Sequence, residues 1–262
     1  MYCNKNNFSN HNALSLAIIF FMMNQTPKIF SKFPEILAFF TDKANENLAF
    51  HVGDDPSLVE IRHEVLACQS GYDCMSLVHM RQIHSDIVHI VSDEDSFTTP
   101  PECDALITDK RNTPLMVMVA DCAPILFYDP KRKVIAVAHA GRAGAFNAIA
   151  SKTVQRMEKE FRTKPKDLLV CIGAGISPCC YEVGQEIADE AHAKGFAYAI
   201  ETKGEKYFLD INKILRTQLL GCGIDAKHLE IVNKCTACDT KTYFSYRAEG
   251  KTGRFSGVLM LK

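Results

Sequence analysis

The chain has 262 residues, of which 47% are hydrophobic and 23% are charged, as in an ordinary globular protein. Its formal net charge is −1, which gives no bulk attraction to nucleic acid or to anionic lipid. We therefore expect a small-molecule substrate, with neither nucleic acid nor a membrane as a partner.

The N-terminus carries one apolar run, ALSLAIIFFMM at residues 13–23. This run is too short to span a bilayer. It has the length of the apolar part of a signal peptide, but Lys5 is the only positive charge before it and no A-x-A cleavage pattern follows. We predict that residues 1–23 are an extension, with Met22 or Met23 as an alternative start, and that residues 24–262 form a single domain.

Capping residues and apolar periodicity predict the elements that follow. Asp55 and Pro56 open a first helix, Gly195 closes the third, and Asp210 caps the fourth. The predicted helices are 56–69, 144–161, 182–194 and 210–220. Short apolar runs predict strands at 47–52, 76–82, 87–91, 105–108, 115–120, 125–128, 134–138, 168–172, 228–232, 243–246 and 258–261. This order favours a mixed α/β sandwich over a strict βαβ repeat.

The eleven cysteines are an odd number, and several lie inside apolar runs. Free cysteine is often buried, so we expect reduced thiols and a cytoplasmic location. Cys235 and Cys238 form one CxxC, which by itself is weak evidence for a redox or metal role.

Three polar segments end apolar strands, at 81–85, 119–124 and 138–144. They contain His84, Cys122 and His139, and two imidazoles with one thiolate are a sound ligand set for zinc. Three protein ligands leave a fourth position open for water or substrate, as in catalytic sites. The spacing matches no short zinc-finger pattern, so ordinary buried side chains remain an alternative for each residue.

Two further segments could bind an anion. Gly141 and Gly144 flank a turn before a predicted helix, where free N–H groups and Arg142 could hold phosphate, although geometry alone favours an ordinary strand–turn–helix joint. Arg247 and Arg254 lie in a loop near the C-terminus and could bind an anion bidentately, or could simply be solvated. The glycine-rich segment 173–184 is neither a GxGxxG nor a P-loop and is a plausible pocket wall.

Together these segments resemble one family, variously described as laccase-domain, bacterial polyphenol-oxidase or peptidoglycan-editing-factor proteins and reassigned as purine nucleoside phosphorylases. The resemblance covers residues 28–261, and its landmarks are HVGDDP at 51–56, QIHSD at 82–86, CDALIT at 103–108, VADCAPILFYDP at 119–130, VAHAG at 137–141, PCCYEVG at 178–184 and TGR at 252–254.

The resemblance implies a multilayer α/β/β/α sandwich with mixed sheets. It places a zinc ion on His84, Cys122 and His139, which would also be the catalytic residues. It implies phosphorolysis of adenosine, inosine and methylthioadenosine, with adenosine deamination as a further activity. Purine nucleosides and phosphate are then the partners, and either a monomer or a homodimer is compatible with the sequence.

The chain departs from the family pattern at two places. HAGRAG at 139–144 has Arg142 and Ala143 where the family usually has Trp and Arg. If the family arginine contacts phosphate, its role passes to Arg142 or is lost. In addition, TDKANENL at 41–48 lacks the early GG-x-S turn of the family.

Three other functions use the same residues. A copper-dependent polyphenol oxidase would need many histidines, usually in HxH pairs, and the nine histidines here include no such pair. A metal-free hydrolase or peptidoglycan-precursor editing factor would use Cys122 as nucleophile and His139 as base. A non-catalytic zinc-binding module would need a fourth ligand, for which Cys179 and Cys180 are candidates.

Overall fold

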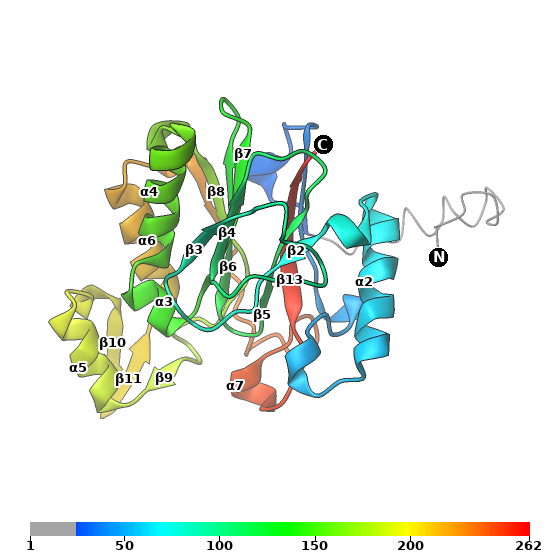
Figure 1. The fold of residues 1–262 in the computed structure, drawn as a ribbon. Coiled ribbons are helices and arrows are strands. Elements are labelled where there is room, and N and C mark those ends of the chain that lie inside the picture. Colours follow the sequence, from blue (N-terminus) through cyan, green and yellow to red (C-terminus); the bar gives the residue numbers. More distant parts are fainter. Residues whose placement is uncertain (1–24) are drawn as a thin grey trace.

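Two β-sheets packed face to face, with helices on both outer faces, form the body of the protein (Figure 1). The computed structural model describes residues 25–262, so the predicted N-terminal extension and its alternative start methionines lie outside the described residues. The layers follow the order helix, sheet, sheet, helix, and both sheets are mixed. The predicted α/β/β/α sandwich is therefore confirmed.

Each of the two sheets contains strands from distant parts of the chain. The six-stranded sheet has the order β12-β8-β6-β7-β4-β3, and the four-stranded sheet has the order β1-β13-β5-β2. The first comprises β3 (Val88–Ile90), β4 (Ala105–Thr108), β6 (Ala123–Asp129), β7 (Val134–Ala140), β8 (Leu169–Ile172) and β12 (Leu229–Ile231). The second comprises β1 (Ile36–Phe40), β2 (Val78–His79), β5 (Leu115–Val119) and β13 (Phe255–Leu261).

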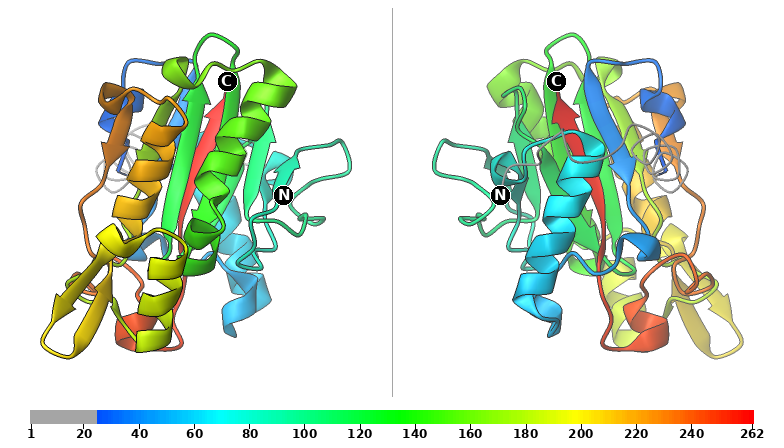
Figure 2. Two further views of the ribbon diagram at one scale, coloured as in Figure 1. Left: turned by 90° about the vertical axis from the view of Figure 1, so that its left-hand side faces the viewer. Right: turned by 90° about the vertical axis from the view of Figure 1, so that its right-hand side faces the viewer.

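Helices cover the outer face of each sheet, as the two side views show (Figure 2). The four-stranded sheet is covered by α2 (Pro56–Ser70), and the six-stranded sheet by α3 (Arg142–Phe146), α4 (Ile149–Phe161) and α6 (Ile211–Gly221). A small third sheet comprises β9 (Glu182–Val183), β10 (Ile200–Lys203) and β11 (Lys206–Leu209) and lies beside α5 (Gln185–Ala193), while α7 (Tyr246–Glu249) precedes β13. Short 3-10 helices span Lys28–Phe30, Lys43–Asn45, Phe50–Val52, Cys74–Ser76, Pro165–Asp167, Ala197–Ala199 and Ala226–His228. No helix in residues 25–262 is long and apolar enough to cross a bilayer.

The core consists of three apolar layers because the strands are buried on both faces. Along β6, Ile125 and Phe127 pack toward the helices, whereas Leu126 and Tyr128 pack between the two sheets. Successive side chains of a strand point to opposite faces, so one continuous apolar run serves two layers. A third cluster, between α2 and the four-stranded sheet, includes Phe39, Leu48, Leu66, Met116, Met118 and Val258.

Most predicted elements are found within a few residues, but two predicted strands are wrong. Residues 47–52 form a turn and a 3-10 helix, because the Asn47 side chain donates to the Ala49 carbonyl at 2.9 Å and accepts from its N–H at 3.0 Å. Residues 243–246 lead into α7, whose first turn is capped by the hydroxyl of Ser245. In both segments a polar side chain bonds to the local backbone in place of a neighbouring strand.

Two predicted helices differ from the structure. The helix predicted over 144–161 is divided into α3 and α4 at Ala148, which has a left-handed φ of 63°. The helix predicted over 182–194 begins only at Gln185, because Glu182 and Val183 pair with β11. The strands β1, β10 and β11 were not predicted.

Two histidines are buried beneath α2, beside Phe50 and Phe97. His63 donates through Nε2 to the Leu48 carbonyl at 2.8 Å, and His79 bonds to the Phe97 carbonyl at 3.1 Å. The Nδ1 atom of each ring has no partner. Burial, assisted by the neighbouring His79, lowers the pKa of His63 to about 4, and burial also lowers the pKa of His79. Both rings are therefore neutral near pH 7.

We predict that acid destabilises the protein through His63. Below pH 6.5 the unfolded chain binds a proton at His63 that the folded chain does not bind, so the free energy of unfolding falls as the pH drops from about 6.5 to about 4, by about 3 kcal/mol from this residue. Urea unfolding of the wild type and His63→Gln across this range should show a shallower pH dependence in the variant. The matched change His228→Gln, at a partly exposed ring, should leave the slope unaltered; equal slopes in all three proteins would contradict the assignment.

Candidate functional site

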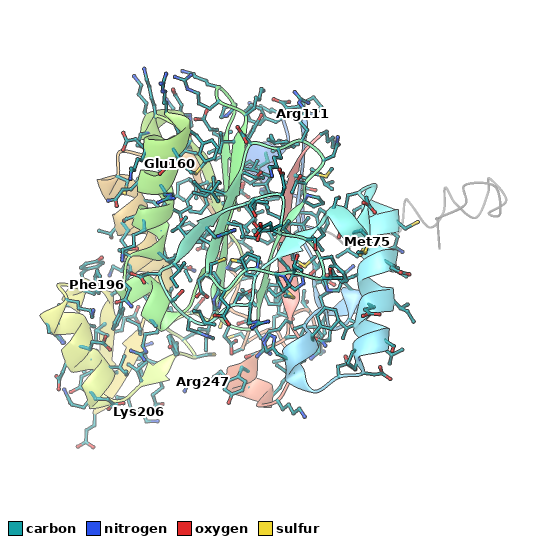
Figure 3. The ribbon with its side chains drawn as sticks, in the orientation of Figure 1. Met75, Arg111, Glu160, Phe196, Lys206 and Arg247 are labelled. Atoms are coloured by element: carbon teal, nitrogen blue, oxygen red, sulfur yellow. The ribbon has the colours of Figure 1, made fainter. Side chains whose placement is uncertain are left out.

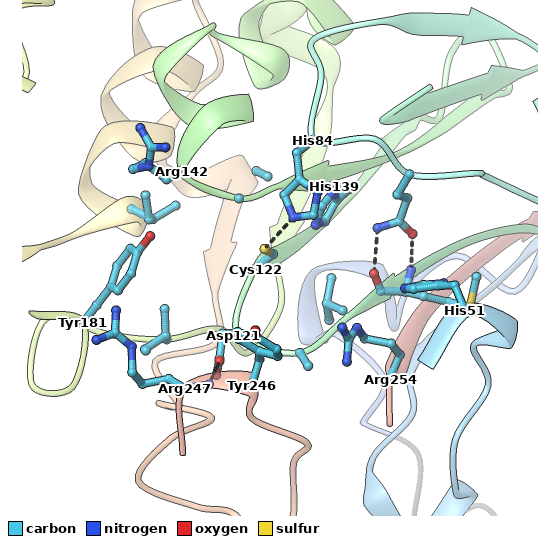
Figure 4. A pocket seen from close by; sticks show the side chains of 18 residues that line it. His51, His84, Asp121, Cys122, His139, Arg142, Tyr181, Tyr246, Arg247 and Arg254 are labelled. Atoms are coloured by element: carbon cyan, nitrogen blue, oxygen red, sulfur yellow. Dashed lines mark hydrogen bonds between the residues drawn. The ribbon is translucent and has the colours of Figure 1, made fainter. Parts of the chain in front are cut away.

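The structure brings His84, Cys122 and His139 together at one end of the sandwich (Figure 4). Their potential ligand atoms all lie within 4.8 Å of one another, with 4.0 Å between Cys122 Sγ and His84 Nε2. The two imidazole rings meet edge to face, with centroids 4.8 Å apart. These are the three residues that the sequence predicts as metal ligands and catalytic groups.

Strand register and sheet crossing explain why these residues meet. The pairing of Ala105 with Ala138 continues by one residue, so Asp104 lies opposite His139, whose N–H donates to the Asp104 carbonyl at 2.8 Å. Pro124 pairs with His139 from the other side, which places Cys122 diagonally across on the same face. Cys122 lies where the chain passes from β5 to β6, and His84 lies where it passes from β2 to β3. Both connections cross from one sheet to the other.

A buried carboxylate, which the sequence does not mark as a site residue, orients the His139 ring and holds the backbone of His84. Asp104 is fully buried and accepts a hydrogen bond from His139 Nδ1 at 2.8 Å. It also accepts from the Ser85 N–H and hydroxyl at 2.6 and 2.7 Å and from the His84 N–H at 3.2 Å. With its Nδ1–H held by Asp104, His139 leaves Nε2 for a metal, an arrangement common at metal sites. The one feature of the sequence that could have indicated this role is an aspartate inside the apolar CDALIT run.

Opposite charges stabilise the trio electrostatically. Burial opposes ionisation of Cys122, but His139 and His84 outweigh it and lower the pKa of its thiol to about 6. Burial likewise opposes protonation of His139, but the Cys122 thiolate and Asp104 raise its pKa to about 9. Despite its burial, bonds from His139 and Ser85 lower the pKa of Asp104 to about 2. The site thus favours a thiolate beside a cation.

The backbone around the trio is strained and tightly packed. His84 and Asp121 both have left-handed φ angles, 58° and 85°. The Asp121 carboxylate accepts from the Thr236 and Ser245 hydroxyls at 2.6 and 2.7 Å and from the Arg247 N–H at 2.7 Å, which holds this conformation next to Cys122. At Gly141 a Cβ would lie 2.9 Å from Cys122 Sγ, so only glycine leaves the cradle of the trio open.

The donor set fits a single metal ion. A tetrahedral zinc with ordinary Zn–S and Zn–N bonds separates a sulfur from a nitrogen by about 3.6 Å, close to the observed 4.0 Å between Cys122 Sγ and His84 Nε2. Cys179 and Cys180, which the binding-module alternative requires as a fourth ligand, instead gather with Cys235 and Cys238. Within residues 25–262 a metal at the trio would therefore have three protein ligands, and the trio faces a pocket.

The pocket beside the trio has a volume of about 560 Å³, within the range of small-molecule sites. Tyr181, Tyr246 and His51 line it, and none of these had been singled out from the sequence. Tyr246 is 62% exposed although it is a large aromatic residue. Burial first, and then the charge of Arg254, lowers the pKa of His51. The pocket therefore offers aromatic faces beside the metal-ligand trio.

All three predicted arginines line the same pocket but differ in their partners. Arg142 forms an ion pair with Glu190 at 2.7 Å. Arg247 extends from α7 toward the small sheet, where it donates to the Glu182 carbonyl at 2.9 Å (Figure 3). Arg254 is half-buried and donates to two main-chain carbonyls of its own loop, at 2.8 and 2.9 Å. In the part of the chain that the structure describes, neither Arg247 nor Arg254 has a carboxylate partner.

The arginines lie on two sides of the trio. Arg142 and Arg247 lie on the side of Tyr181, and Arg254 lies with His51 on the other side (Figure 4). The anion site predicted at the Gly141 turn, beside Arg142, is thus one of several places in the pocket where an arginine could meet an anion. The roles of these residues in binding stay predictions.

We predict that Asp104→Asn destabilises the fold even without a metal. The amide would direct N–H groups at the donors of Ser85 and His139 and remove the charge that they stabilise, at a cost of about 3 kcal/mol. Urea unfolding in excess chelator measures this loss. Asp86→Asn, which removes a partly exposed ion pair with Lys152, should cost less than about 1 kcal/mol. Similar losses in the two variants would refute a special role for Asp104.

Comparisons with known proteins agree with this architecture. A purine nucleoside phosphorylase of Corynebacterium glutamicum is 40% identical over 220 residues, covering 83% of this chain and 87% of the relative. The crystal structure of the Bacillus licheniformis hypothetical protein YfiH superposes with a TM-score of 0.85 at 30% identity, covering 92% of this chain and 97% of the other. The structure of YlmD from Geobacillus stearothermophilus gives a TM-score of 0.82 at 29% identity, covering 88% and 94%.

The family model described as multi-copper polyphenol oxidoreductase laccase matches residues 40–262, nearly all of the described chain. This chain therefore belongs to that laccase-like family.

Proposed function

We propose that this protein is a zinc-dependent purine nucleoside phosphorylase that cleaves adenosine, inosine and methylthioadenosine with phosphate. The observation that carries the proposal is the juxtaposition of a three-ligand metal site, exposed aromatic faces and arginines without carboxylate partners in one pocket. Relatives named purine nucleoside phosphorylase, at 28–40% identity over most of their length, support it.

Zinc is the proposed metal because two imidazoles and one thiolate suit its ligand preferences. The copper alternative suggested by the family description would need several copper sites. Within residues 25–262, His84, Cys122 and His139 are the only group of potential ligands that contains histidine. This favours a single-metal enzyme over a multi-copper oxidase.

The purine would occupy the aromatic part of the pocket. Tyr246 projects from α7 into this region and is largely exposed, and Tyr181 lies beside Arg247, whose guanidinium is 5.4 Å from the ring centroid. Stacking on an aromatic face binds any purine base and does not depend on its exocyclic groups. This accounts for acceptance of both adenosine and inosine.

Phosphate would bind at Arg254. Among the described residues, the half-buried Arg254 guanidinium hydrogen-bonds only to main-chain carbonyls and has no carboxylate in direct contact, so an anionic ligand would complete its surroundings. Arg247 can add charge from the other side, and Arg142 less, because Glu190 already neutralises it.

In the reaction a phosphate oxygen bonds to the anomeric carbon as the bond from that carbon to the purine nitrogen breaks, through a state with oxocarbenium character. The arginines orient the phosphate for this attack, and the tyrosines hold the base in place. His84, Cys122 and His139, whose ring is oriented by Asp104, would hold the metal and leave its fourth position open. When bound, zinc supplies Lewis acidity toward a substrate oxygen.

Adenosine deamination is proposed as a side activity of the same pocket, since it needs the same metal and the same purine contacts. We also propose a cytoplasmic location. Cys103 and Cys171 are buried as free thiols in the core, as expected in a reducing compartment.

The phosphorylase proposal predicts that base release requires phosphate. Adenosine, inosine and methylthioadenosine are incubated with the protein with and without phosphate, and products are separated by chromatography. Free base and ribose 1-phosphate should form only with phosphate, whereas inosine formed from adenosine without phosphate reports deamination. Cys122→Ala should lose at least about 100-fold in kcat/KM because a ligand is removed from the metal. Full phosphorolysis by Cys122→Ala would exclude a metal-centred mechanism.

The arginine assignment predicts a selective effect on phosphate. Arg254→Gln should raise the KM for phosphate by about 10- to 100-fold, the loss expected for a charge-assisted hydrogen bond, with little change in the KM for inosine. Arg142→Gln, whose charge is shared with Glu190, should change the phosphate KM by less than about threefold. A larger effect of Arg142→Gln than of Arg254→Gln would contradict this assignment and indicate that phosphate binds on the other side of the trio.

A further inference from the structure

Four cysteines outside the trio converge on a second cluster. Cys179 and Cys180 lie in the turn before β9, and Cys235 and Cys238 lie in the loop after β12. Their sulfur atoms all lie within 4.8 Å of one another. We propose that these four residues form a second metal site, a closed tetrathiolate site for zinc that is separate from the trio and structural in role.

The sulfur separations favour a shared metal over a disulfide. Cys238 Sγ lies 3.5 Å from Cys179 Sγ and 3.3 Å from Cys180 Sγ, and all four cysteines are free thiols. A disulfide from Cys238 could join only one of these two partners, and the two similar separations single out neither. Four sulfurs at ordinary Zn–S distances around a tetrahedral zinc are about 3.8 Å apart. The observed separations lie close to this value.

Main-chain contacts hold the two loops in place independently of the sulfurs. Gly175 and Cys235 form a parallel bridge, with Thr236 N–H donating to the Gly175 carbonyl at 3.2 Å. The N–H of Ser177 donates to Cys235 Sγ at 3.4 Å. A sulfur atom that accepts such a bond is held in position as a thiolate ligand. Supporting hydrogen bonds orient the ligands at other metal sites in the same way.

Four protein ligands leave no position for a substrate, so this site would act through structure. Each thiol that binds as thiolate releases its proton to solvent, and the zinc with four thiolates carries a net charge of −2. The four-cysteine site would therefore bind a divalent metal through soft sulfur ligands alone, whereas the trio combines one sulfur with two nitrogens.

The cluster adjoins the pocket on two sides. Tyr181, which lines the pocket, follows Cys180 directly. Thr236, between Cys235 and Cys238, donates its hydroxyl to Asp121 at 2.6 Å, and Asp121 precedes Cys122. A metal that ties the two loops together would fix one wall of the pocket and the support of the strained Asp121.

Metal content of the full chain tests the proposal. Proteins expressed with zinc and freed of loose metal are analysed by elemental mass spectrometry. Two zinc ions per chain are expected for the wild type, one for Cys122→Ser, one for Cys238→Ser and none for the double variant. Cys74→Ser, at a cysteine on the far side of the four-stranded sheet, is the matched control and should keep two. Cys238 is exposed, so its substitution should be tolerated.

A second readout uses cobalt in the Cys122→Ser background. The remaining site should give the intense visible absorption of tetrahedral cobalt bound by thiolates, and this absorption should vanish in Cys122→Ser/Cys238→Ser. A folded Cys122→Ser protein that binds neither zinc nor cobalt would overturn the proposal. So would an intact mass two hydrogens lighter that maps to a bond between Cys238 and Cys179 or Cys180 in freshly purified protein. None of these measurements depends on nucleoside cleavage, so they separate this proposal from the proposed function.

Discussion

The site depends on the buried carboxylate of Asp104. A buried charge is costly unless it is fully hydrogen-bonded, and Asp104 obtains its partners from the His139 ring on β7 and from the backbone of His84 and Ser85. The same contacts that satisfy the carboxylate therefore fix the His139 imidazole and the backbone that carries His84. The loop between β2 and β3 cannot move away without leaving the charge unpaired, so the metal ligands are positioned by the fold before any metal binds.

The architecture supplies the rest of the geometry through its sheet crossings. The chain passes between the two sheets at Cys122 and again near His84, at the same end of the sandwich. His84 and Asp121, which lie in these connections, both have left-handed φ angles. Such strain persists only where the surroundings enforce it. Here three donors, from Thr236, Ser245 and Arg247, hold the Asp121 carboxylate.

Physical chemistry explains which features the sequence could predict. The strands β4 to β8 are apolar runs buried on both faces, so burial alone marks them. By contrast, β10 is almost wholly exposed and has no such run. Ligand chemistry and the family resemblance indicated the trio, because imidazole and thiolate are reactive types wherever they lie. The importance of Asp104 and Tyr181 depends on strand register and loop packing, which local sequence patterns do not encode. The same holds for the cysteine cluster, since two adjacent cysteines and a distant CxxC become one site only when β8 and β12 pair.

The two clusters of metal-ligand side chains then suit different roles at one pocket. The trio has three ligands of mixed type and faces the cavity, which suits chemistry on a bound substrate. The four-cysteine cluster is closed and joins two loops, which suits stabilisation. One short path links them, from Cys235 and Cys238 through the Thr236 hydroxyl to Asp121 and then along the chain to Cys122. Because Asp121 is strained, its conformation relies on its three donors, of which that hydroxyl is one. The order of the cysteine loop is therefore a condition for the position of the reactive thiolate, although no cysteine of that loop contacts the trio's pocket directly.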